Sequence, residues 1–457
     1  MAGIGFSLTQ LLNRNSIISK IVAYSVSASI SCGPLLIAIL SIYILGTFIL
    51  YDKTYQQSVT EFQLSITYLI AFSMIFSSPL QISFPRFLAD EIYLNRQQGV
   101  IPSLNGTMLV MTVCASVIAF IVGFSLFPAQ SLLFKYAFIA IFVILCNLWI
   151  IVSLLTGLKN YGEIVRGFIS CYALILSLAY WLRDTGLSGF MLSYLIGHVV
   201  LFLILLRAIH KEYPTNLFIN FSFFNKNKMH TSLVWSSIYF NLGIWIDKFI
   251  FWFTPSTSES IIGPFRGSIV YDDAIFIAYL FAAPGITTLL LCLETFFSEY
   301  YEKFHQSIML GAPLNFILML RDRLSIYAFD VVLSVAKIQF FIIVITIQYA
   351  SKILEFFKIA EIYSNLLLID VIGTSFQIVF MSALTLLYYM DKRMCALRSC
   401  QLLFVLNTSL SILSIYLGPY FYGLGFTITM MCSSCYVIYL LNREFIDLDH
   451  KVIMMHD

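Results

Sequence analysis

Hydrophobic residues form long continuous runs along almost the whole chain, and polar residues gather between the runs. A helix needs about 20 apolar residues to cross the hydrocarbon core of a bilayer. The strands of a membrane barrel would instead alternate apolar and polar residues. Twelve runs are candidate membrane helices, near residues 21–50, 63–84, 107–127, 136–158, 167–182, 187–206, 232–253, 274–297, 325–347, 362–389, 396–417 and 420–441. The pattern predicts an all-α polytopic membrane protein with about twelve transmembrane helices.

The composition points to the same class of protein. Hydrophobic residues make up 60% of the 457 residues, charged residues make up 11%, and the mean hydropathy is +0.89. Soluble domains carry about 25% charged residues. The chain is therefore expected to lie in a membrane.

The distribution of basic residues predicts the orientation. If both termini are cytoplasmic, 18 of the 26 Lys and Arg residues fall on the inner side, six fall on the outer side, and Lys248 and Lys337 lie inside spans. Lys and Arg in short loops are retained in the cytoplasm. We therefore expect both termini inside. The apolar run after Lys20 is too long for a cleaved signal peptide and is expected to be a signal anchor.

The spans are expected to form two lobes. Pro79 and Pro284 stand at similar places in the second and eighth runs, which suggests two related halves. Two six-helix repeats suit alternating access around a central cavity. The predicted parts are an N-terminal six-helix bundle at 1–206, a basic cytoplasmic connection at 207–231 and a C-terminal six-helix bundle at 232–457.

A cytoplasmic segment near 299–323 mixes aromatic, apolar and charged residues. This composition predicts an amphipathic element, which either rests on the membrane surface or offers a docking surface to a soluble partner.

The seventh run carries the most suggestive polar residues. Asn241, Trp245, Lys248 and Trp252 recur at helical spacing and share one stripe, with Asp247 on an adjacent face. Indole rings can stack on pyranose rings, while amide and ammonium groups hydrogen-bond hydroxyl and acetamido groups. The stripe predicts part of a transport pathway for a sugar.

Other polar residues inside spans extend the predicted pathway, because a charge at the centre of a bilayer costs about 2.5 to 3.5 kcal/mol on insertion scales. The alternative is that these charges neutralise one another or reach the headgroups. The residues are Thr287, Glu294, Asp330, Lys337, Asp370, Thr374 and Gln377.

Several kinds of chemistry are not expected. The sequence contains no G-x-x-x-x-G-K-[S/T] phosphate loop. The six His residues are scattered, and the Cys432–Cys435 pair has no second pair to complete a metal site. We therefore expect no enzyme activity, no catalytic residues, no metal and no cofactor.

Short motifs in the first hundred residues resemble the PelG family. They are the opening Met1–Phe6, the interruption Ser31–Pro34, the segments Phe62–Tyr68 and Ser78–Gln81, and the charged run Arg86–Asp90. PelG proteins are inner-membrane components of the Pel exopolysaccharide system of bacterial biofilms, and they are similar to flippases of the multidrug/oligosaccharidyl-lipid/polysaccharide exporter (MOP) superfamily.

This resemblance implies a substrate and partners. The substrate would be an N-acetylgalactosamine-rich polysaccharide. The partners would be a cytosolic glycosyltransferase that uses UDP-N-acetylhexosamine, and Pel membrane proteins that include a cyclic-di-GMP receptor. No nucleic acid is expected as a partner. Thr9 and Gln10 depart from the charged residues expected in the family's opening.

We therefore predict translocation of an N-acetylhexosamine exopolysaccharide across the bacterial cytoplasmic membrane within a Pel-type synthase complex. One alternative is a cation-coupled exporter of small amphiphiles, in which Asp247 or Asp370 binds H⁺ or Na⁺. Another is a non-conducting scaffold that recruits the glycosyltransferase through 299–323 and 207–231.

Overall fold

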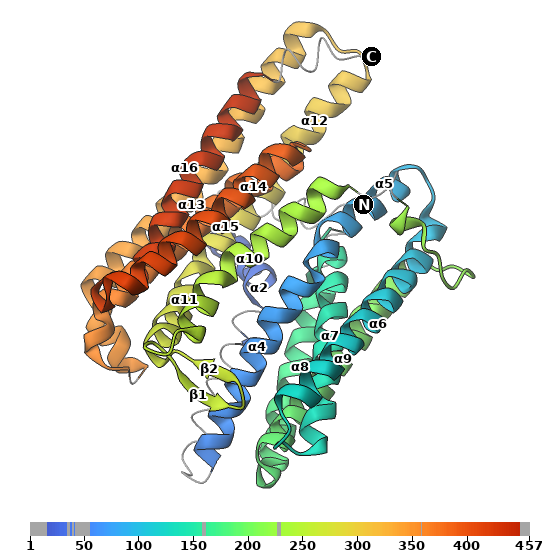
Figure 1. Cartoon of the computed structure of the whole chain (residues 1–457). Coiled ribbons are helices and arrows are strands. Elements are labelled where there is room, and N and C mark those ends of the chain that lie inside the picture. Colours follow the sequence, from blue (N-terminus) through green and yellow to red (C-terminus); the bar gives the residue numbers. More distant parts are fainter. Residues whose placement is uncertain are drawn as a thin grey trace. The chain divides into compact units, whose positions relative to one another are not determined.

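The fold is built almost entirely of helices (Figure 1). The computed structural model describes residues 16–33, 37–38, 41, 55–157, 161–225, 230–357 and 359–447. Within these ranges, ten helices are long and apolar enough to cross a membrane. The predicted all-α polytopic class is confirmed. Of the first predicted span, only part can be compared, because most of 34–50 lies outside the described residues.

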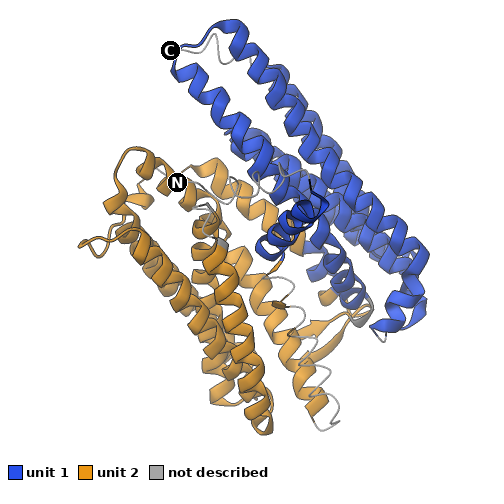
Figure 2. Ribbon diagram, turned by 180° about the vertical axis from the view of Figure 1, so that it is seen from behind, with its two compact units in different colours: residues 1–32, 246–251, 269–457 blue, residues 33–245, 252–268 orange. Residues whose placement is uncertain are grey.

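The helices pack into two compact units, which Figure 2 colours separately. Unit 1 comprises residues 1–32, 246–251 and 269–457, and unit 2 comprises residues 33–245 and 252–268. The limits of the units therefore differ from the predicted connection at 207–231, because short segments on each side of it group with the unit formed mainly by the other side. The division into two six-helix bundles at that connection stays a prediction.

Unit 1 is organised around α14. This helix packs against α11, α13, α15 and α16, and α2 packs against α11. Near Pro284 in α11, the side chains of Cys32 and Gln339 donate hydrogen bonds to the carbonyls of Ala283 and Ala282. The elements of unit 1 are α2 (Ile17–Ser31), α11 (Ile269–Cys292), the π-helical turn η5 (Leu293–Phe297), α12 (Ser298–Met309), α13 (Leu314–Phe356), η6 (Glu361–Tyr363), α14 (Ser364–Tyr389), α15 (Arg393–Leu417), η7 (Pro419–Phe421) and α16 (Leu424–Ile446).

Unit 2 is organised around α7, which packs against α4, α6, α8 and α9. The middle part of each of these helices is apolar. One face of the helix packs against its neighbours, and the other faces expose apolar side chains to the bilayer. The elements of unit 2 are α4 (Gln56–Gln81), α5 (Ser83–Tyr93), η2 (Gln97–Gly99), α6 (Val100–Leu126), α7 (Leu132–Gly157), α8 (Tyr161–Trp181), η3 (Arg183–Thr185), α9 (Leu187–Glu212), η4 (Ser222–Phe224), β1 (Glu259–Ile262) and β2 (Phe265–Gly267).

One long helix belongs to both units. Helix α10 (Thr231–Phe253) has 23 residues, of which 246–251 pack in unit 1 and the others pack in unit 2. It is not among the ten most apolar membrane-length helices, because Asn241, Asp247 and Lys248 interrupt its hydrophobic sequence. A long helix that carries an acidic and a basic residue side by side therefore contributes to both units.

The predicted amphipathic segment at 299–323 is divided between two helices. Helices α11, η5 and α12 form one helical run that ends at Met309, and α13 begins at Leu314. Gly311 has a φ of 65°, a conformation that glycine adopts easily, and Pro313 precedes the new helix. The segment is therefore a helical hairpin turn with Leu310 84% exposed.

The part of the predicted connection 207–231 that the structure describes is held by contacts with α5 and α6. Phe223 is buried and its ring packs edge-on against Phe84 and Phe87 of α5. The backbone N–H of Asn220 donates to the carbonyl of Pro102 in α6. These contacts hold the connection against unit 2.

A β-hairpin lies between α10 and α11. Strands β1 and β2 pair antiparallel, and a one-residue irregularity interrupts their register. The ring of Tyr68 in α4 lies between Phe265, at 4.0 Å, and Trp252, at 4.5 Å. The Tyr68 hydroxyl also donates to the carbonyl of Arg266 at 2.8 Å. The hairpin is thus fixed to α4 by stacking and by a hydrogen bond.

Candidate functional site

A buried ion pair lies where α10 enters unit 1. Lys248 Nζ is 3.1 Å from Asp247 Oδ2, and the two side chains are 6% and 0% exposed. Neighbouring residues of a helix point about 100° apart, so the Lys248 side chain must bend toward its neighbour. Two opposite charges are thus held together inside the protein.

Hydrogen bonds from two other helices complete the surroundings of Asp247. The Tyr271 hydroxyl in α11 donates to Oδ2 at 2.7 Å, and Asn407 Nδ2 in α15 donates to Oδ1 at 3.3 Å. Ser411 in turn donates to Asn407 Oδ1 at 3.1 Å. A buried ion pair is stable only when further hydrogen bonds satisfy its charged atoms. The carboxylate of Asp247 meets this condition.

Aromatic rings surround the ammonium group of Lys248. Nζ lies 5.3 Å from the ring centroid of Tyr279 in α11 and 5.3 Å from that of Phe426 in α16. A cation is attracted to the face of an aromatic ring within about 6 Å. Helices α10, α11, α15 and α16 therefore all contribute to one buried site, the Asp247–Lys248 cluster.

Asp370 in α14 differs from Asp247. It is fully buried, yet neither carboxylate oxygen has a hydrogen-bond partner within the described ranges. Its Oδ1 lies close to Gly423 at the start of α16, where an added Cβ would come within 2.6 Å. An ionised carboxylate buried without donors is energetically costly. Asp370 is therefore a polar group that a proton, a cation or a hydroxyl-bearing ligand could satisfy.

The predicted stripe on α10 is divided between the two units. Asn241 is buried in unit 2 and donates to Gln81 at 3.4 Å and to the Ser237 carbonyl at 3.0 Å. Trp252 is buried against Tyr68, and Trp245 is partly exposed. Lys248 alone of the four belongs to unit 1. In this structure three of the four stripe residues are buried, and their role in a pathway stays a prediction.

The other residues predicted for the pathway lie on different helices and in different surroundings. Thr374 donates to the carbonyl of Ala278, and Gln377 is buried one turn further along α14. Thr287 lies at the contact of α11 with α2, where its carbonyl accepts a hydrogen bond from Ser27. Glu294 is buried in the π-helical turn η5, and such turns often occur at functional sites.

Asp330 and Lys337 do not join the buried cluster. Both are exposed side chains on α13. The seven-residue spacing places them on one face of the helix, as the sequence predicted, but that face is not buried in the protein.

Sequence reasoning missed four contributors to the cluster. They are Tyr271, Tyr279, Asn407 and Phe426. For Asn407 the sequence contained a signal, because an Asn in the middle of an apolar run is a buried polar residue that needs a partner. The three aromatic residues are surrounded by many others of their kind and carry no comparable signal.

No metal centre is formed by the described part of the chain. No group of three or more His, Cys, Asp or Glu side chains there lies close enough to hold a metal ion. The cysteines that the structure describes form no disulfide bonds with one another.

The family model for PelG, described as "Putative exopolysaccharide Exporter (EPS-E)", matches residues 1–452. The chain belongs to the PelG family. The resemblance seen in the first hundred residues thus extends over nearly the whole sequence. A comparison with curated proteins gave no match.

Solved transporter structures share the fold of this PelG-family chain. An outward-facing multidrug resistance MATE family transporter of the MOP superfamily is 14% identical, with a TM-score of 0.69, over 97% of this chain and 98% of that one. A MOP superfamily transporter from Pyrococcus furiosus is 13% identical, with a TM-score of 0.65, over 96% and 98%. A MATE protein in complex with Br-NRF is 12% identical, with a TM-score of 0.60, over 96% and 99%. The chain therefore has the same fold as these transporters, and the predicted fold class is confirmed.

Proposed function

We propose that this chain translocates an N-acetylhexosamine exopolysaccharide, rich in N-acetylgalactosamine, across the bacterial cytoplasmic membrane as part of a Pel-type synthase complex. The match to the exopolysaccharide exporter family over residues 1–452 carries the proposal. The MOP transporter fold supports it, since polytopic helices of this arrangement serve transport. Both termini are proposed to be cytoplasmic.

The Asp247–Lys248 cluster is the proposed polar element of the pathway. It offers a carboxylate, an ammonium, an amide and two phenol groups within one unit, together with aromatic faces. The hydroxyl and acetamido groups of a sugar could form hydrogen bonds with these side chains, because the sugar and the side chains both offer donors and acceptors. In alternating access, one bundle rocks against the other around the binding site. Because α10 contributes residues to both units, such a movement would act directly on Asp247 and Lys248.

Polymer synthesis is the proposed source of energy. A cytosolic glycosyltransferase that uses UDP-N-acetylhexosamine would feed the growing chain, and membrane partners including a cyclic-di-GMP receptor would regulate it. The turn between α12 and α13 is the proposed docking point, since Met309 is 74% exposed and Leu310 is 84% exposed there. Exposed apolar patches mark interaction surfaces.

Polymer translocation into proteoliposomes tests the proposal. The vesicles would hold the full chain with its glycosyltransferase and membrane partners, and UDP-N-acetylhexosamine would be supplied outside. We expect polymer protected in the lumen with the wild type, and a loss of at least about tenfold with the double variant Asp247→Asn/Lys248→Met. The double variant removes both charges and so avoids an unpaired buried charge.

A matched control uses charges on an exposed surface. Glu355→Gln/Lys352→Met removes one acid and one base from an exposed face of α13 and should leave translocation unchanged. Equal translocation by the wild type and the α10 double variant would remove the cluster from the pathway. Loss of polymer only after changes at Met309 and Leu310 would support the scaffold function instead.

Asp370 favours a second candidate function, the cation-coupled export of small amphiphiles. Its carboxylate oxygens have no partner within the described ranges, as a site for H⁺ or Na⁺ requires. Efflux of a dye by the chain alone, driven by a proton or sodium gradient and lost in Asp370→Asn, would support this function. Absence of gradient-driven efflux, together with polymer translocation in the complete system, would reject it.

A further inference from the structure

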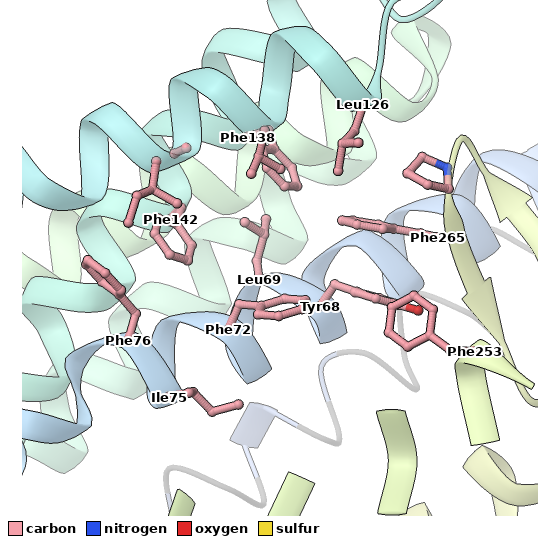
Figure 3. Close-up of a pocket in the computed structure, with 14 residues that line it drawn as sticks. Tyr68, Leu69, Phe72, Ile75, Phe76, Leu126, Phe138, Phe142, Phe253 and Phe265 are labelled. Atoms are coloured by element: carbon pink, nitrogen blue, oxygen red, sulfur yellow. The ribbon is translucent and has the colours of Figure 1, made fainter. Parts of the chain in front are cut away.

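Unit 2 contains an apolar cavity of about 390 Å³ (Figure 3). Helices α4, α6 and α7, the end of α10 and the β-hairpin line it. Tyr68 is the only lining residue with a polar side chain among those described, and its hydroxyl is already bonded to the backbone of Arg266. A sugar would lose its hydrogen bonds to water here and gain none. The cavity therefore suits a hydrocarbon chain.

A buried basic residue lies at one end of this apolar lining. Lys135 stands three residues before Phe138 and seven before Phe142, so it lies on the same face of α7 as these two lining residues. Only 8% of Lys135 is exposed. Its Nζ donates to the Pro128 carbonyl at 3.1 Å and lies 5.6 Å from the ring of Phe124.

Lys135 has no carboxylate partner in the part of the chain that the structure describes. A buried ammonium group without an anion is unfavourable, since its charge is compensated only by a carbonyl dipole and a ring. Lys135 begins a membrane span, and the distribution of basic residues predicts that it lies at the outer membrane boundary. This is the depth at which phospholipid phosphate groups lie. The ammonium group is thus placed to bind a phosphate.

The bilayer itself is the nearest source of such a ligand. The outward face of α6 exposes large apolar side chains, including Val117 at 56% and Ile121 at 61%. Within a membrane-length helix, such a face contacts lipid. Val122 and Leu126 of the same helix line the cavity.

We propose that unit 2 binds one anionic bilayer phospholipid, with an acyl chain in the cavity beside Phe72, Val122 and Phe142 and with its phosphate at Lys135. Phe265 also lines the cavity and stacks on Tyr68 with an interplanar angle of 7°. The bound chain therefore contacts both Phe265 of the hairpin and Tyr68 of α4. This site is separate from the Asp247–Lys248 cluster and does not depend on the proposed export function.

Photocrosslinking with a phospholipid tests the site. The full chain in nanodiscs would receive phosphatidylglycerol that carries a photoreactive acyl chain, and labelled peptides would be identified by mass spectrometry. We expect labelling of peptides from α4, α6 and α7 that line the cavity. Val122→Trp, which fills the cavity and so excludes the acyl chain sterically, should reduce the labelling at least about tenfold.

Val117→Trp is the matched control. It introduces the same residue on the same helix five positions away, on a face that is exposed and does not line the cavity. It should leave the labelling unchanged. Equal labelling of Val122→Trp and Val117→Trp would overturn the proposal, because the lipid would then lie on the outer surface of α6.

The headgroup is tested separately. Lys135→Met keeps the length and apolar packing of the side chain but removes the charge. It should abolish the preference for phosphatidylglycerol over an uncharged diacylglycerol, which we expect to be about tenfold from a charge-assisted hydrogen bond. A wild type without this preference would overturn the role of Lys135. Displacement of the label by polyprenyl phosphate, but not by unlabelled phosphatidylglycerol, would overturn the choice of a bilayer phospholipid.

Discussion

The interiors of the two units differ in the kind of residue that they bury. Unit 1 buries Asp247, Lys248 and Asp370 among hydrogen-bonding side chains from several helices. Unit 2 buries an aromatic stack around Tyr68 and leaves an apolar cavity. Both units consist mainly of helices long enough to cross a membrane. Damage to the Asp247–Lys248 cluster should therefore leave an uncompensated charge, whereas damage to the stack around Tyr68 should leave a void.

The largest effect is expected from breaking the ion pair in unit 1. Lys248→Met leaves the fully buried carboxylate of Asp247 without its cation, which should lower the free energy of unfolding by about 3–5 kcal/mol. Asp247→Asn/Lys248→Met should recover most of this loss. Denaturant titration in detergent measures both. A single variant as stable as the double variant would show that the charges are not coupled.

A void in unit 2 should have a somewhat smaller effect. Phe265 is 6% exposed and stacks on Tyr68, so Phe265→Ala should cost about 3 kcal/mol. Tyr68→Phe keeps the stacking, loses the two hydrogen bonds between the Tyr68 hydroxyl and the Arg266 backbone, and should cost about 1 kcal/mol. The same titration compares them. If Tyr68→Phe were the more damaging change, hydrogen bonding and not packing would hold the hairpin.

A substitution at Gly423 tests the close contact between this residue and Asp370 in unit 1. Gly423 has a φ of 79° and an added Cβ would approach Asp370 Oδ1, so Gly423→Ala should cost about 2 kcal/mol or more. Gly311→Ala, with a φ of 65° and open space around it, provides the control for backbone strain alone. Equal losses in thermal unfolding experiments would mean that the contact with Asp370 has no effect.

The smallest effect is expected at Asp370 itself. Its oxygens accept no hydrogen bond within the described ranges, so Asp370→Asn removes no such bond and should change stability by less than about 1 kcal/mol. Asp247→Asn alone should cost more, since it leaves Lys248 without its anion. A loss above about 2 kcal/mol for Asp370→Asn would show that the carboxylate is held by a charged partner.

The sequence predicted the helices better than the contacts between them. Long apolar runs are a local property, so the spans could be found without the fold. The partners of Asp247 could not, because Asn407 is 160 residues away along the chain and Tyr271 is one of 27 tyrosines. Asp330 and Lys337 illustrate the same point, since helical spacing placed them on one face but did not show whether that face was buried.

The hairpin was missed for a related reason. Its strands have four and three residues, and such short segments carry no periodic signal. Their position depends on Tyr68, almost 200 residues earlier. Only the tertiary contact distinguishes this segment from an irregular loop.

The π-helical turn Leu293–Phe297 holds one residue more than an α-helical turn that sweeps the same angle. The wider turn takes up this extra residue, so the direction of α12 relative to α11 does not depend on it. Deleting a single residue in the turn would close an ordinary α-helical ladder and leave the side chains of α12 on their present faces. The same deletion inside Ser298–Met309 would instead rotate every later side chain by about 100°. The helical run should therefore tolerate the loss of one residue at the turn, but not a few positions later.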